Sequence, residues 1–520
     1  MILREVLEGV ALRGALPDGL AVRDVAGLEY DSRTVRSGSL FFAFPGARAD
    51  GRAFASEALG RGAMAVVSEL PPPEGFPSGD FPGAWIQVEH GRRALARAAA
   101  NFYGHPDQRV AFTGITGTNG KTTTSYLIDS ILRTAGKVTG LIGTIEYRMA
   151  GDVRPAPNTT PESLDIMRFA AELERRAPAQ ERPHLVAEVS SHALSLGRVW
   201  GFRFHTAVFT NLTRDHLDFH GTMEEYAAAK RLLFAPPEGP SPEWVVLSAD
   251  DPAAQQMIAA GSGDSRVIWY GLSKRAELRA EGLRVGFLGL DFDLAWQGRK
   301  QPIHSPLAGR FNALNILAAA GAGLSYGLDL DAIAQGVAAC IAVPGRFERV
   351  ACGQPFLVVV DYAHTDDALR NTIQAARELT TTIKAHNELA SVRPGRVITV
   401  FGCGGDRDRA KRPLMGMAAA ELSDFVVLTS DNPRSEDPLA IMNDALVGVR
   451  RFDTPMVAEP DRAKAIRLAI SEANPGDVVL IAGKGHETYQ VLKNETIHFD
   501  DRETAREVLE SFGYRDQGRG

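Results

Sequence analysis

Short runs of apolar residues, each followed at once by a cluster of polar ones, recur along this chain. The runs lack the alternation of a half-exposed strand, so they predict strands buried on both faces, as in parallel sheets covered by helices. Ligands bind at the carboxyl ends of such strands, where these polar clusters would lie. The runs and their continuations are Leu185–Val189 before Ser190-Ser-His192, Ala207–Thr210 before Asn211–Asp218, Trp244–Ser248 before Ala249-Asp-Asp251, Leu357–Val360 before Asp361–His364, Arg396–Phe401 before Gly402–Arg409, Phe425–Thr429 before Ser430–Arg434 and Asp477–Ala482 before Gly483–Glu487.

The length of 520 residues exceeds one ordinary core and predicts three domains. We place them at residues 1–90, 91–342 and 343–520, all of the α/β class. In the first, a helix carrying Phe54, Ala58 and Leu59 precedes a buried strand at Ala65–Val67. The most apolar window, Ala313–Leu324, is too short to span a bilayer and predicts a buried helix.

Composition narrows the class of protein. The net charge of −7 argues against a nucleic-acid binder or a membrane-surface binder, since both need a basic face. The three cysteines, Cys340, Cys352 and Cys403, have neither metal-site spacing nor a disulfide framework, and the N-terminus has no signal-peptide layout. We therefore expect a cytoplasmic enzyme, without membrane insertion and monomeric.

A phosphate-binding loop is predicted at Gly114-Ile-Thr-Gly-Thr-Asn-Gly-Lys-Thr-Thr123. An apolar run from Val110 leads into it, and a helical segment, 122–135, leads out. Glycines allow backbone N–H groups to surround a phosphate, Lys121 would reach the terminal phosphates, and Thr122 would bind magnesium. The strict motif has glycine where this chain has Ile115, so a plain strand-to-helix turn is the alternative.

Three residues at predicted strand ends, Glu188, His216 and Asp218, are candidates to surround those phosphates. Glu188 is the strongest of these candidates, because a carboxylate in an apolar strand needs a partner such as magnesium. A salt bridge at the strand end is its alternative interpretation. Lys230 lies in a helical stretch, Met223–Phe234, and the pattern alone predicts a solvated helix lysine.

Two further polar segments have both a functional and a structural interpretation. Residues Gly402–Arg412 carry four cations against two aspartates directly after a buried strand, which suits an anionic ligand, although charged loops are often only solvated. Asp31-Ser-Arg33 is either a turn or a substrate anchor.

Taken together, these motifs resemble the Mur ligase family, the ATP-dependent amino-acid-adding enzymes of peptidoglycan synthesis. The resemblance covers essentially the whole chain. It rests on Thr116–Thr123, Glu188-Val-Ser-Ser-His192, Thr210–Asp218, Gly309-Arg-Phe-Asn-Ala-Leu-Asn315, Pro344-Gly-Arg-Phe-Glu348 and Asp361-Tyr-Ala-His364. Asp31-Ser-Arg33, Asn158-Thr-Thr-Pro161, Asp431-Asn-Pro-Arg434 and Gly483-Lys-Gly-His-Glu487 resemble the members that add the third amino acid.

The resemblance implies a central P-loop ATPase-like parallel sheet, flanked by an N-terminal UDP-binding domain and a C-terminal Rossmann-like domain. It implies ATP contacts at Gly117, Thr118, Asn119, Gly120, Lys121, Thr122, Thr123, Asn312, Arg346 and Asp361. It implies UDP-muramoyl-dipeptide contacts at Ser32, Ala47, Arg48, Ala49, Asn158, Thr159, Thr160, Ser190 and Arg198. Two Mg²⁺ ions would be held by Thr122, Glu188, His216 and Lys230, the last as N6-carboxylysine formed with CO₂, and Lys121, Glu188, His216 and Lys230 would be catalytic.

The implied reaction joins meso-diaminopimelate to the D-glutamate side chain of UDP-N-acetylmuramoyl-L-alanyl-D-glutamate through an acyl phosphate. Arg407, Asp431, Asn432, Pro433, Arg434, Gly483 and Glu487 would bind the incoming amino acid. Arg434 can pair with the far carboxylate of diaminopimelate, which lysine lacks. Addition of L-lysine, a P-loop ATPase or kinase, and a non-catalytic binding protein are the alternatives.

The chain departs from the family pattern in two places. Asp366 replaces the proline expected after Asp361-Tyr-Ala-His-Thr365, which bears on the local turn and on His364. Residues 381–394 are longer than the family norm and predict a surface insertion.

Overall fold

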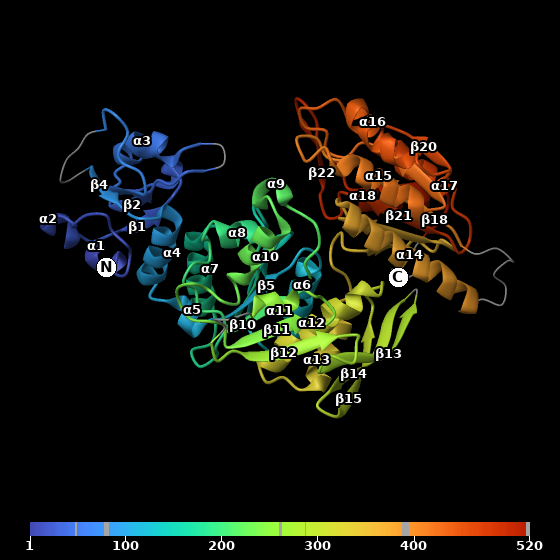
Figure 1. The fold of residues 1–520 in the computed structure, drawn as a ribbon, viewed down its shortest axis with the longest axis horizontal. Helices are drawn as coiled ribbons and strands as arrows, with labels where there is room; N and C mark the ends of the chain where they lie inside the picture. The colour runs from blue at the N-terminus through green and yellow to red at the C-terminus, as the bar shows by residue number, and fades with distance from the viewer. Residues whose placement is uncertain (47–48, 77–82, 259–262, 287, 387–394, 516–520) are drawn as a thin grey trace.

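The computed structural model organises the chain around three parallel-rich sheets and one small hairpin (Figure 1). It describes residues 1–46, 49–76, 83–258, 263–286, 288–386 and 395–515, with the side chains of 381–386 excepted. Within those residues, no helix is long and apolar enough to cross a membrane.

The N-terminal sheet has four parallel strands in the order β1-β2-β3-β4. The predicted strand at 65–67 is β3, and Ala58 is buried in α3. Phe54, predicted to belong to this helix, instead ends the 3₁₀ turn η2 that precedes it and is 43% exposed. The elements are α1 (Leu3–Val6), α2 (Asp18–Ala21), β1 (Gly27–Glu29), η1 (Ser32–Thr34), β2 (Ser39–Phe42), η2 (Gly51–Phe54), α3 (Ala55–Gly60), β3 (Ala65–Ser68) and β4 (Ala84–Gln87).

The central sheet has eleven strands in the order β15-β14-β13-β12-β11-β10-β5-β9-β6-β7-β8. Strands from β12 to β6 run parallel, and antiparallel hairpins extend both edges. The elements are α4 (Gly91–Phe102), α5 (Pro106–Arg109), β5 (Ala111–Thr116), α6 (Lys121–Thr134), β6 (Thr139–Ile142), β7 (Glu146–Met149), β8 (Asp152–Pro155), α7 (Ser163–Arg176), β9 (His184–Glu188), α8 (Ser191–Ser195), β10 (Thr206–Phe209), α9 (Leu217–His220), α10 (Met223–Arg231), β11 (Trp244–Ser248), α11 (Ala254–Met257), β12 (Arg266–Gly271), β13 (Leu278–Gly286), β14 (Gly289–Trp296), β15 (Arg299–Ser305), α12 (Phe311–Ser325) and α13 (Leu330–Ala339).

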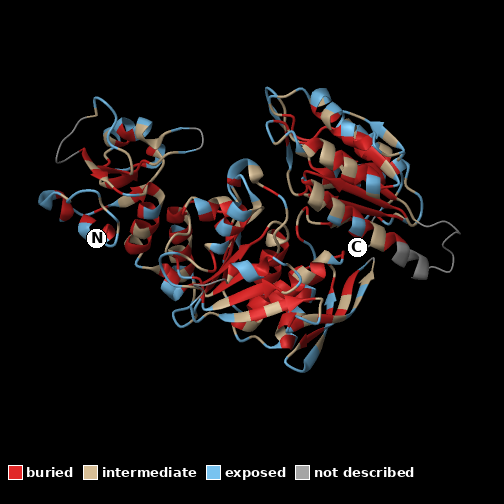
Figure 2. Cartoon of the chain, in the orientation of Figure 1, coloured by how far each residue is buried: buried red, intermediate tan, exposed pale blue. Residues whose placement is uncertain are grey.

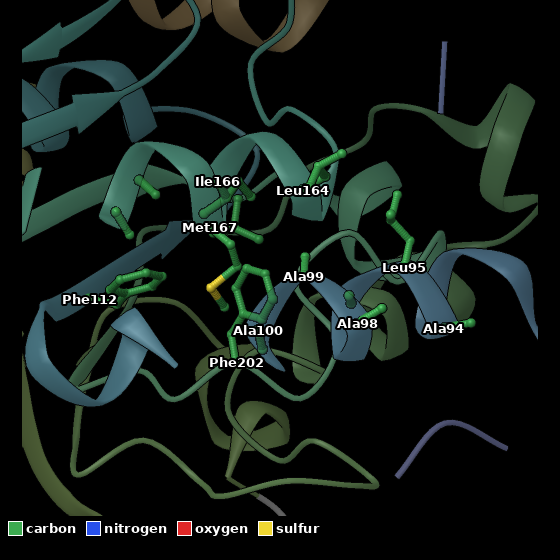
Figure 3. Close-up of a cluster of buried hydrophobic side chains, with 14 of the residues drawn as sticks. Ala94, Leu95, Ala98, Ala99, Ala100, Phe112, Leu164, Ile166, Met167 and Phe202 are labelled. Carbon is green, nitrogen blue, oxygen red and sulfur yellow. The ribbon is translucent and has the colours of Figure 1, made fainter. Parts of the chain in front are cut away.

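Helices cover both faces of the central sheet. One core joins α6, α12 and α13 to the strands, and the apolar window at 313–324 is indeed the buried helix α12. The other core contains α4 and α7, and Leu95, Ala99, Met167 and Phe112 of β5 all belong to it (Figure 3). The strands are therefore buried from both sides, as their continuous apolar runs predicted (Figure 2).

The C-terminal sheet has the order β16-β17-β21-β18-β19-β20, parallel except for β16. Helices α14, α15 and α16 cover one face, and α17 and α18 the other. The elements are β16 (Glu348–Val350), β17 (Leu357–Asp361), α14 (Asp366–His386), β18 (Val397–Phe401), α15 (Lys411–Leu422), β19 (Phe425–Leu428), α16 (Pro438–Val449), β20 (Met456–Ala458), α17 (Arg462–Ser471), β21 (Val478–Ala482), β22 (Tyr489–Val491), β23 (Thr496–His498) and α18 (Asp501–Ser511).

One departure from the family pattern, and the first part of the other, lie in α14. Asp366 is its first residue, a position where an acidic side chain favours the helix dipole. Of the predicted insertion at 381–394, the part up to His386 continues this helix, and residues 387–394 lie outside the described residues.

Candidate functional site

A cleft of about 760 Å³ lies between the carboxyl end of the central sheet and the start of the C-terminal unit. Neighbouring strands β10, β5 and β9 bring three loops to it, which begin at Asn211, Gly117 and Ser190. Residues 361–365, after β17, close the other side. The convergence of polar strand ends predicted from the sequence is confirmed for this edge.

The phosphate-loop motif forms a tight strand-to-helix turn in this cleft. Ile115, at the position where the strict motif has glycine, is a fully buried residue of β5, so the turn begins only at Gly117. A Cβ on Gly117 would overlap Thr210 Oγ1, and one on Gly120 would overlap the Asn315 side chain. Both glycines also have positive φ angles, of 150° and 85°. These positions therefore require glycine.

Lys121 and Thr122 follow directly at the start of α6. Lys121 Nζ donates to the carbonyl oxygens of Gly117 and Thr118, at 2.9 and 2.8 Å, and burial lowers the pKa of this amine. Thr122 Oγ1 donates to Glu188 Oε2 at 3.0 Å. The cation and the hydroxyl are thus both fixed at the helix N-terminus.

Glu188, at the end of β9, is fully buried. It accepts hydrogen bonds from the backbone N–H and the hydroxyl of Thr144, both at 2.9 Å, besides that of Thr122. Among the described residues it forms no ion pair, so the alternative of a strand-end salt bridge is wrong. A charged carboxylate held only by neutral donors is suited to a cation.

His216 and Asp215 lie on the loop after β10. His216 has a left-handed φ of 53° and is the N-cap residue of α9, and its backbone N–H donates to Asp215 Oδ1 at 2.8 Å. Burial lowers the pKa of His216 to about 4, against the opposing charge of Asp215. Burial raises the pKa of the Asp215 carboxyl, but the charges of His216 and Lys411 outweigh this effect and lower that pKa to about 2.

Asp218 does not belong to the cleft, contrary to the prediction. It is exposed on α9 and is absent from the residues that line the cleft. His216, with its left-handed backbone, is the N-cap of α9, and Asp218 lies on the exposed side of this short helix, whereas His220 is buried.

Lys230 is buried, 1% exposed, so the pattern-based prediction of a solvated lysine is wrong. Its Nζ lies 4.2 Å from the centre of the Tyr226 ring, and it forms no ion pair with a described carboxylate. Burial, helped by the charge of Lys121, lowers the pKa of this amine well below its ordinary value. Sequence periodicity missed this burial because the surrounding alanines carry no strong apolar signal.

Among the described residues, no three His, Cys, Asp or Glu side chains are grouped closely enough to hold a metal ion by themselves. Thr122, Glu188, His216 and Lys230 nevertheless all line the same cleft. Substrate oxygens or a modified lysine would have to complete any ligand set.

The residues predicted for the muramoyl-dipeptide divide into two groups. The following line the cleft: Asn158, Thr159, Thr160, Ser190 and Arg198. Within that group, Thr160 Oγ1 donates to the Glu188 carbonyl at 2.8 Å, and Arg198 donates to the Thr160 carbonyl at 2.8 Å. Ser32 and Ala49 belong to the N-terminal unit, where Ser32 donates to Glu57 at 2.8 Å. Ala47 and Arg48 lie outside the described residues.

The remaining ATP candidates come from three segments. Arg346 donates to Thr122 Oγ1 at 3.2 Å. Asp361 is buried, and it accepts backbone N–H bonds from Phe347 and Ala363, at 2.7 and 2.9 Å; burial raises its pKa. Asn312 does not line the cleft but binds Asn315, which does, at 2.9 Å.

The predicted amino-acid-binding residues meet at the carboxyl edge of the C-terminal sheet. Asn432 Nδ2 donates to Glu487 Oε2 at 2.8 Å, and a Cβ on Gly483 would lie 2.7 Å from Asp431 Oδ2. A Cβ on Gly404 would lie 3.0 Å from Arg434 and 3.7 Å from Arg407, so both arginines flank this glycine. Pro433 lies between Asn432 and Arg434 on the same loop. These residues do not line the larger cleft.

Lys484 lies in the motif Gly483–Glu487, but the sequence alone did not identify it as a functional residue. It is fully buried, and its Nζ lies 3.2 Å from both Asn432 Oδ1 and Glu487 Oε2 and 3.8 Å from Asp431 Oδ1. A lysine directly after an apolar strand was the available signal, because a buried ammonium needs anionic partners.

The cationic segment Gly402–Arg412 offers a ligand less charge than predicted. Arg409 pairs with Asp444 at 3.1 Å, Arg412 with Glu436 at 2.7 Å, and Lys411 with Asp215 at 2.6 Å. Among its four cations only Arg407 forms no ion pair with a described residue; it is exposed and donates to the Asp406 carbonyl at 3.2 Å. Most of this charge therefore holds the fold.

Comparison with known proteins shows the family. The Mur ligase middle domain matches residues 115–323, the Mur ligase glutamate ligase domain 345–485, and the Mur ligase family catalytic domain 24–103. Together with the full-length relatives described next, these matches establish that the chain belongs to the Mur ligase family, whose members are ligases.

Two relatives that match nearly the whole chain have the same name. A protein of Solibacter usitatus is 59% identical to this chain over 515 residues, which cover 99% of each chain. A protein of Geobacillus kaustophilus is 46% identical over 498 residues, which cover 94% of this chain and 96% of the relative. Both are called UDP-N-acetylmuramoyl-L-alanyl-D-glutamate–2,6-diaminopimelate ligase. A solved structure of that name is 32% identical, with a TM-score of 0.67 over 99% of both chains. A MurF structure from Acinetobacter baumannii, 18% identical with a TM-score of 0.62 over 93% of this chain and 95% of its own, shares the fold.

Proposed function

We propose that this chain joins meso-2,6-diaminopimelate to the D-glutamate side-chain carboxylate of UDP-N-acetylmuramoyl-L-alanyl-D-glutamate, with conversion of ATP to ADP and phosphate. The relatives that cover nearly its whole length carry the name of this activity. Residues 1–90 would hold the UDP end, 91–342 the ATP and dipeptide, and 343–520 the diaminopimelate.

The specificity for diaminopimelate is inferred from the hydrogen-bond partners of Arg434. Its guanidinium Nη1 donates to the Gly405 carbonyl at 2.7 Å and to the Asn432 carbonyl at 3.5 Å, and it forms no ion pair with a described carboxylate. Arg409, just before α15, and Arg412, within it, are both paired with carboxylates. Arg434 is therefore left to pair with the far carboxylate of diaminopimelate, which L-lysine does not have.

The phosphate site would bind ATP together with magnesium. Backbone N–H groups from Gly117 to Thr123 and the ammonium of Lys121 would hold the phosphates. Thr122 and Glu188, with His216 and a carboxylated Lys230, would bind two magnesium ions. When bound, magnesium would neutralise charge on the transferred phosphoryl group.

Carboxylation of Lys230 fits its surroundings. Burial lowers the pKa of this amine and so favours its neutral form, which is the form that adds to CO₂. The nitrogen bonds to the CO₂ carbon and releases one proton, which leaves a carbamate. That group would supply the carboxylate that the described His, Cys, Asp and Glu side chains do not provide here.

The proposed reaction has two steps. The dipeptide carboxylate, held near Thr160, Ser190 and Arg198, attacks the γ-phosphorus of ATP; ADP leaves and an acyl phosphate forms. The amino group of diaminopimelate attacks the acyl carbon, and phosphate leaves as the amide forms. Arg346 and residues 361–365 line the cleft on its C-terminal side, where they would help to exclude water from the acyl phosphate.

Phosphate release and product mass test this proposal together. With ATP, Mg²⁺ and the UDP-muramoyl dipeptide, we expect phosphate release that depends on meso-diaminopimelate, and a product heavier by one diaminopimelate residue. Phosphate release without any amine would instead indicate a plain ATPase. A product containing lysine, when both amines are supplied, would keep the ligase and contradict the assignment to Arg434.

A further inference from the structure

One ion pair bridges the central and C-terminal units beside the phosphate loop. Lys411 Nζ, at the first residue of α15, lies 2.6 Å from Asp215 Oδ1 on the loop after β10. Both side chains are largely buried, 22% and 9% exposed. A pair shielded in this way is weakly screened and leaves a costly unpaired charge if one partner is removed.

The same carboxylate also holds His216. Asp215 Oδ1 accepts the His216 backbone N–H at 2.8 Å, and Oδ2 lies 3.3 Å from the ring Nε2. The cation from the C-terminal unit and the imidazole of the cleft thus share one partner. With Lys411 removed, the ring would be the nearest remaining group to satisfy the buried carboxylate.

A second contact crosses the same boundary. Asp367 Oδ2 in α14 accepts from Asn119 Nδ2 at 3.0 Å and from Thr213 Oγ1 at 2.8 Å. Asn119 belongs to the phosphate loop, and Thr213 is two residues before Asp215. The C-terminal unit therefore contacts both loops that surround the phosphate site.

We propose that Lys411 is a positioning residue, which couples docking of the C-terminal unit to the orientation of His216 through Asp215. When the unit docks, the ammonium pairs with Oδ1 of Asp215 and holds the carboxylate in the position from which its Oδ2 orients the His216 ring. Phosphoryl transfer then proceeds only in the docked state, which protects the acyl phosphate from water. The inference rests on the proposed function, because it requires His216 to act in phosphoryl transfer.

Kinetics of three variants test this role. Lys411→Met, which keeps the length but removes the charge, should lower kcat about 10- to 100-fold, as loss of a group that orients a ligand residue does. The KM values for ATP and diaminopimelate should stay within about twofold, and Lys411→Arg should restore most of kcat. Arg409→Met, which breaks an exposed pair within the C-terminal unit two residues away, is the matched control and should leave kcat unchanged.

Zero-length cross-linking supplies a readout independent of activity. A carbodiimide should join Lys411 to Asp215 in the full-length protein, detected as one linked peptide pair by mass spectrometry and missing in Lys411→Met. The linked pair should become more abundant when ADP and the UDP-muramoyl dipeptide are added.

Three results would overturn the coupling: a Lys411→Met enzyme with the parent kcat, an increase confined to the KM for diaminopimelate, or no Lys411–Asp215 link under any condition. Failure of the proposed function looks different, because the parent protein itself would then release no phosphate with diaminopimelate. The cross-link would still report docking in that case.

Discussion

At the scale of single residues, Arg434 differs from the paired cations of the C-terminal unit. Arg409, Lys411 and Arg412 are each paired with a carboxylate, whereas Arg434 binds only main-chain carbonyls. Arg434 also has a left-handed φ of 53°, a conformation that costs free energy in a residue other than glycine. The fold therefore maintains this side chain in a defined place without giving it a carboxylate partner.

Arg434→Ala should lower kcat/KM for meso-diaminopimelate by about 10- to 100-fold, the loss expected for hydrogen bonds to a charged group. The value for L-lysine should hardly change, because lysine offers no second carboxylate. Steady-state rates with each amine measure this. An equal loss for both amines would mean that Arg434 supports the loop rather than selecting the substrate.

Lys484→Met should raise the KM for diaminopimelate about 10-fold, since Asn432 and Glu487 lose the cation that fixes them. The KM for ATP should remain within about twofold, because the phosphate loop lies in another unit. Titration of each substrate separates the two constants. An unchanged KM for diaminopimelate would show that Lys484 serves only the fold.

At the scale of elements, the site depends on where strands end and on what fills the space behind them. Arg462 in α17 and Asp501 in α18 form a fully buried bidentate pair, with both contacts at 2.7 Å. Arg462 also donates to the carbonyls of Ser430 and Ala482, at 3.4 and 3.0 Å. These are the residues directly before Asp431 and Gly483, so the pair fixes the two strand ends from behind.

Arg462→Met should lower the free energy of unfolding by about 3–5 kcal/mol, because Asp501 would remain charged and buried. Lys464→Met is the matched control in the same helix. Its pair with Asp461 is exposed, 71% and 46%, so that change should cost less than about 1 kcal/mol. Urea unfolding followed by circular dichroism compares the two, and similar losses would contradict the account.

Gly117→Ala should weaken ATP binding by about 10-fold or more, because the added Cβ would overlap Thr210 and displace the loop. Gly60→Ala, in α3 with open space around its Cβ, is the control and should leave ATP binding intact. Calorimetric titration with ADP or a non-hydrolysable ATP analogue measures both. Parent-like affinity in Gly117→Ala would rule out this loop as the phosphate site.

At this scale the sequence predicted a good deal. Continuous apolar runs identified buried strands such as β9 and β21, and the polar residues after them do meet at the sheet edges. Two predictions from the pattern were wrong: Lys230 is buried rather than solvated, and Asp218 lies outside the cleft. Local periodicity does not encode the causes of these two positions. Lys230 is buried against the Tyr226 ring, and Asp218 follows the left-handed backbone of His216.

At the scale of the whole molecule, function depends on contacts between distant parts of the chain. Lys411 meets Asp215 and Asp367 meets Asn119 across 196 and 248 residues. No spacing rule in the sequence predicts such pairs, because each partner is explained locally as an ordinary polar loop or helix residue. The resemblance to the Mur ligases predicted the three-part architecture, whereas the docking contacts required the structure.

The central claim is that this molecule selects meso-diaminopimelate as its amine substrate. The measurement that tests it most directly is the ratio of kcat/KM for meso-diaminopimelate to that for L-lysine, with the UDP-muramoyl dipeptide, ATP and Mg²⁺ in saturating amounts. We predict a ratio of at least about 100, since lysine would leave Arg434 without its carboxylate partner. A ratio near one, or a preference for lysine, would contradict the account.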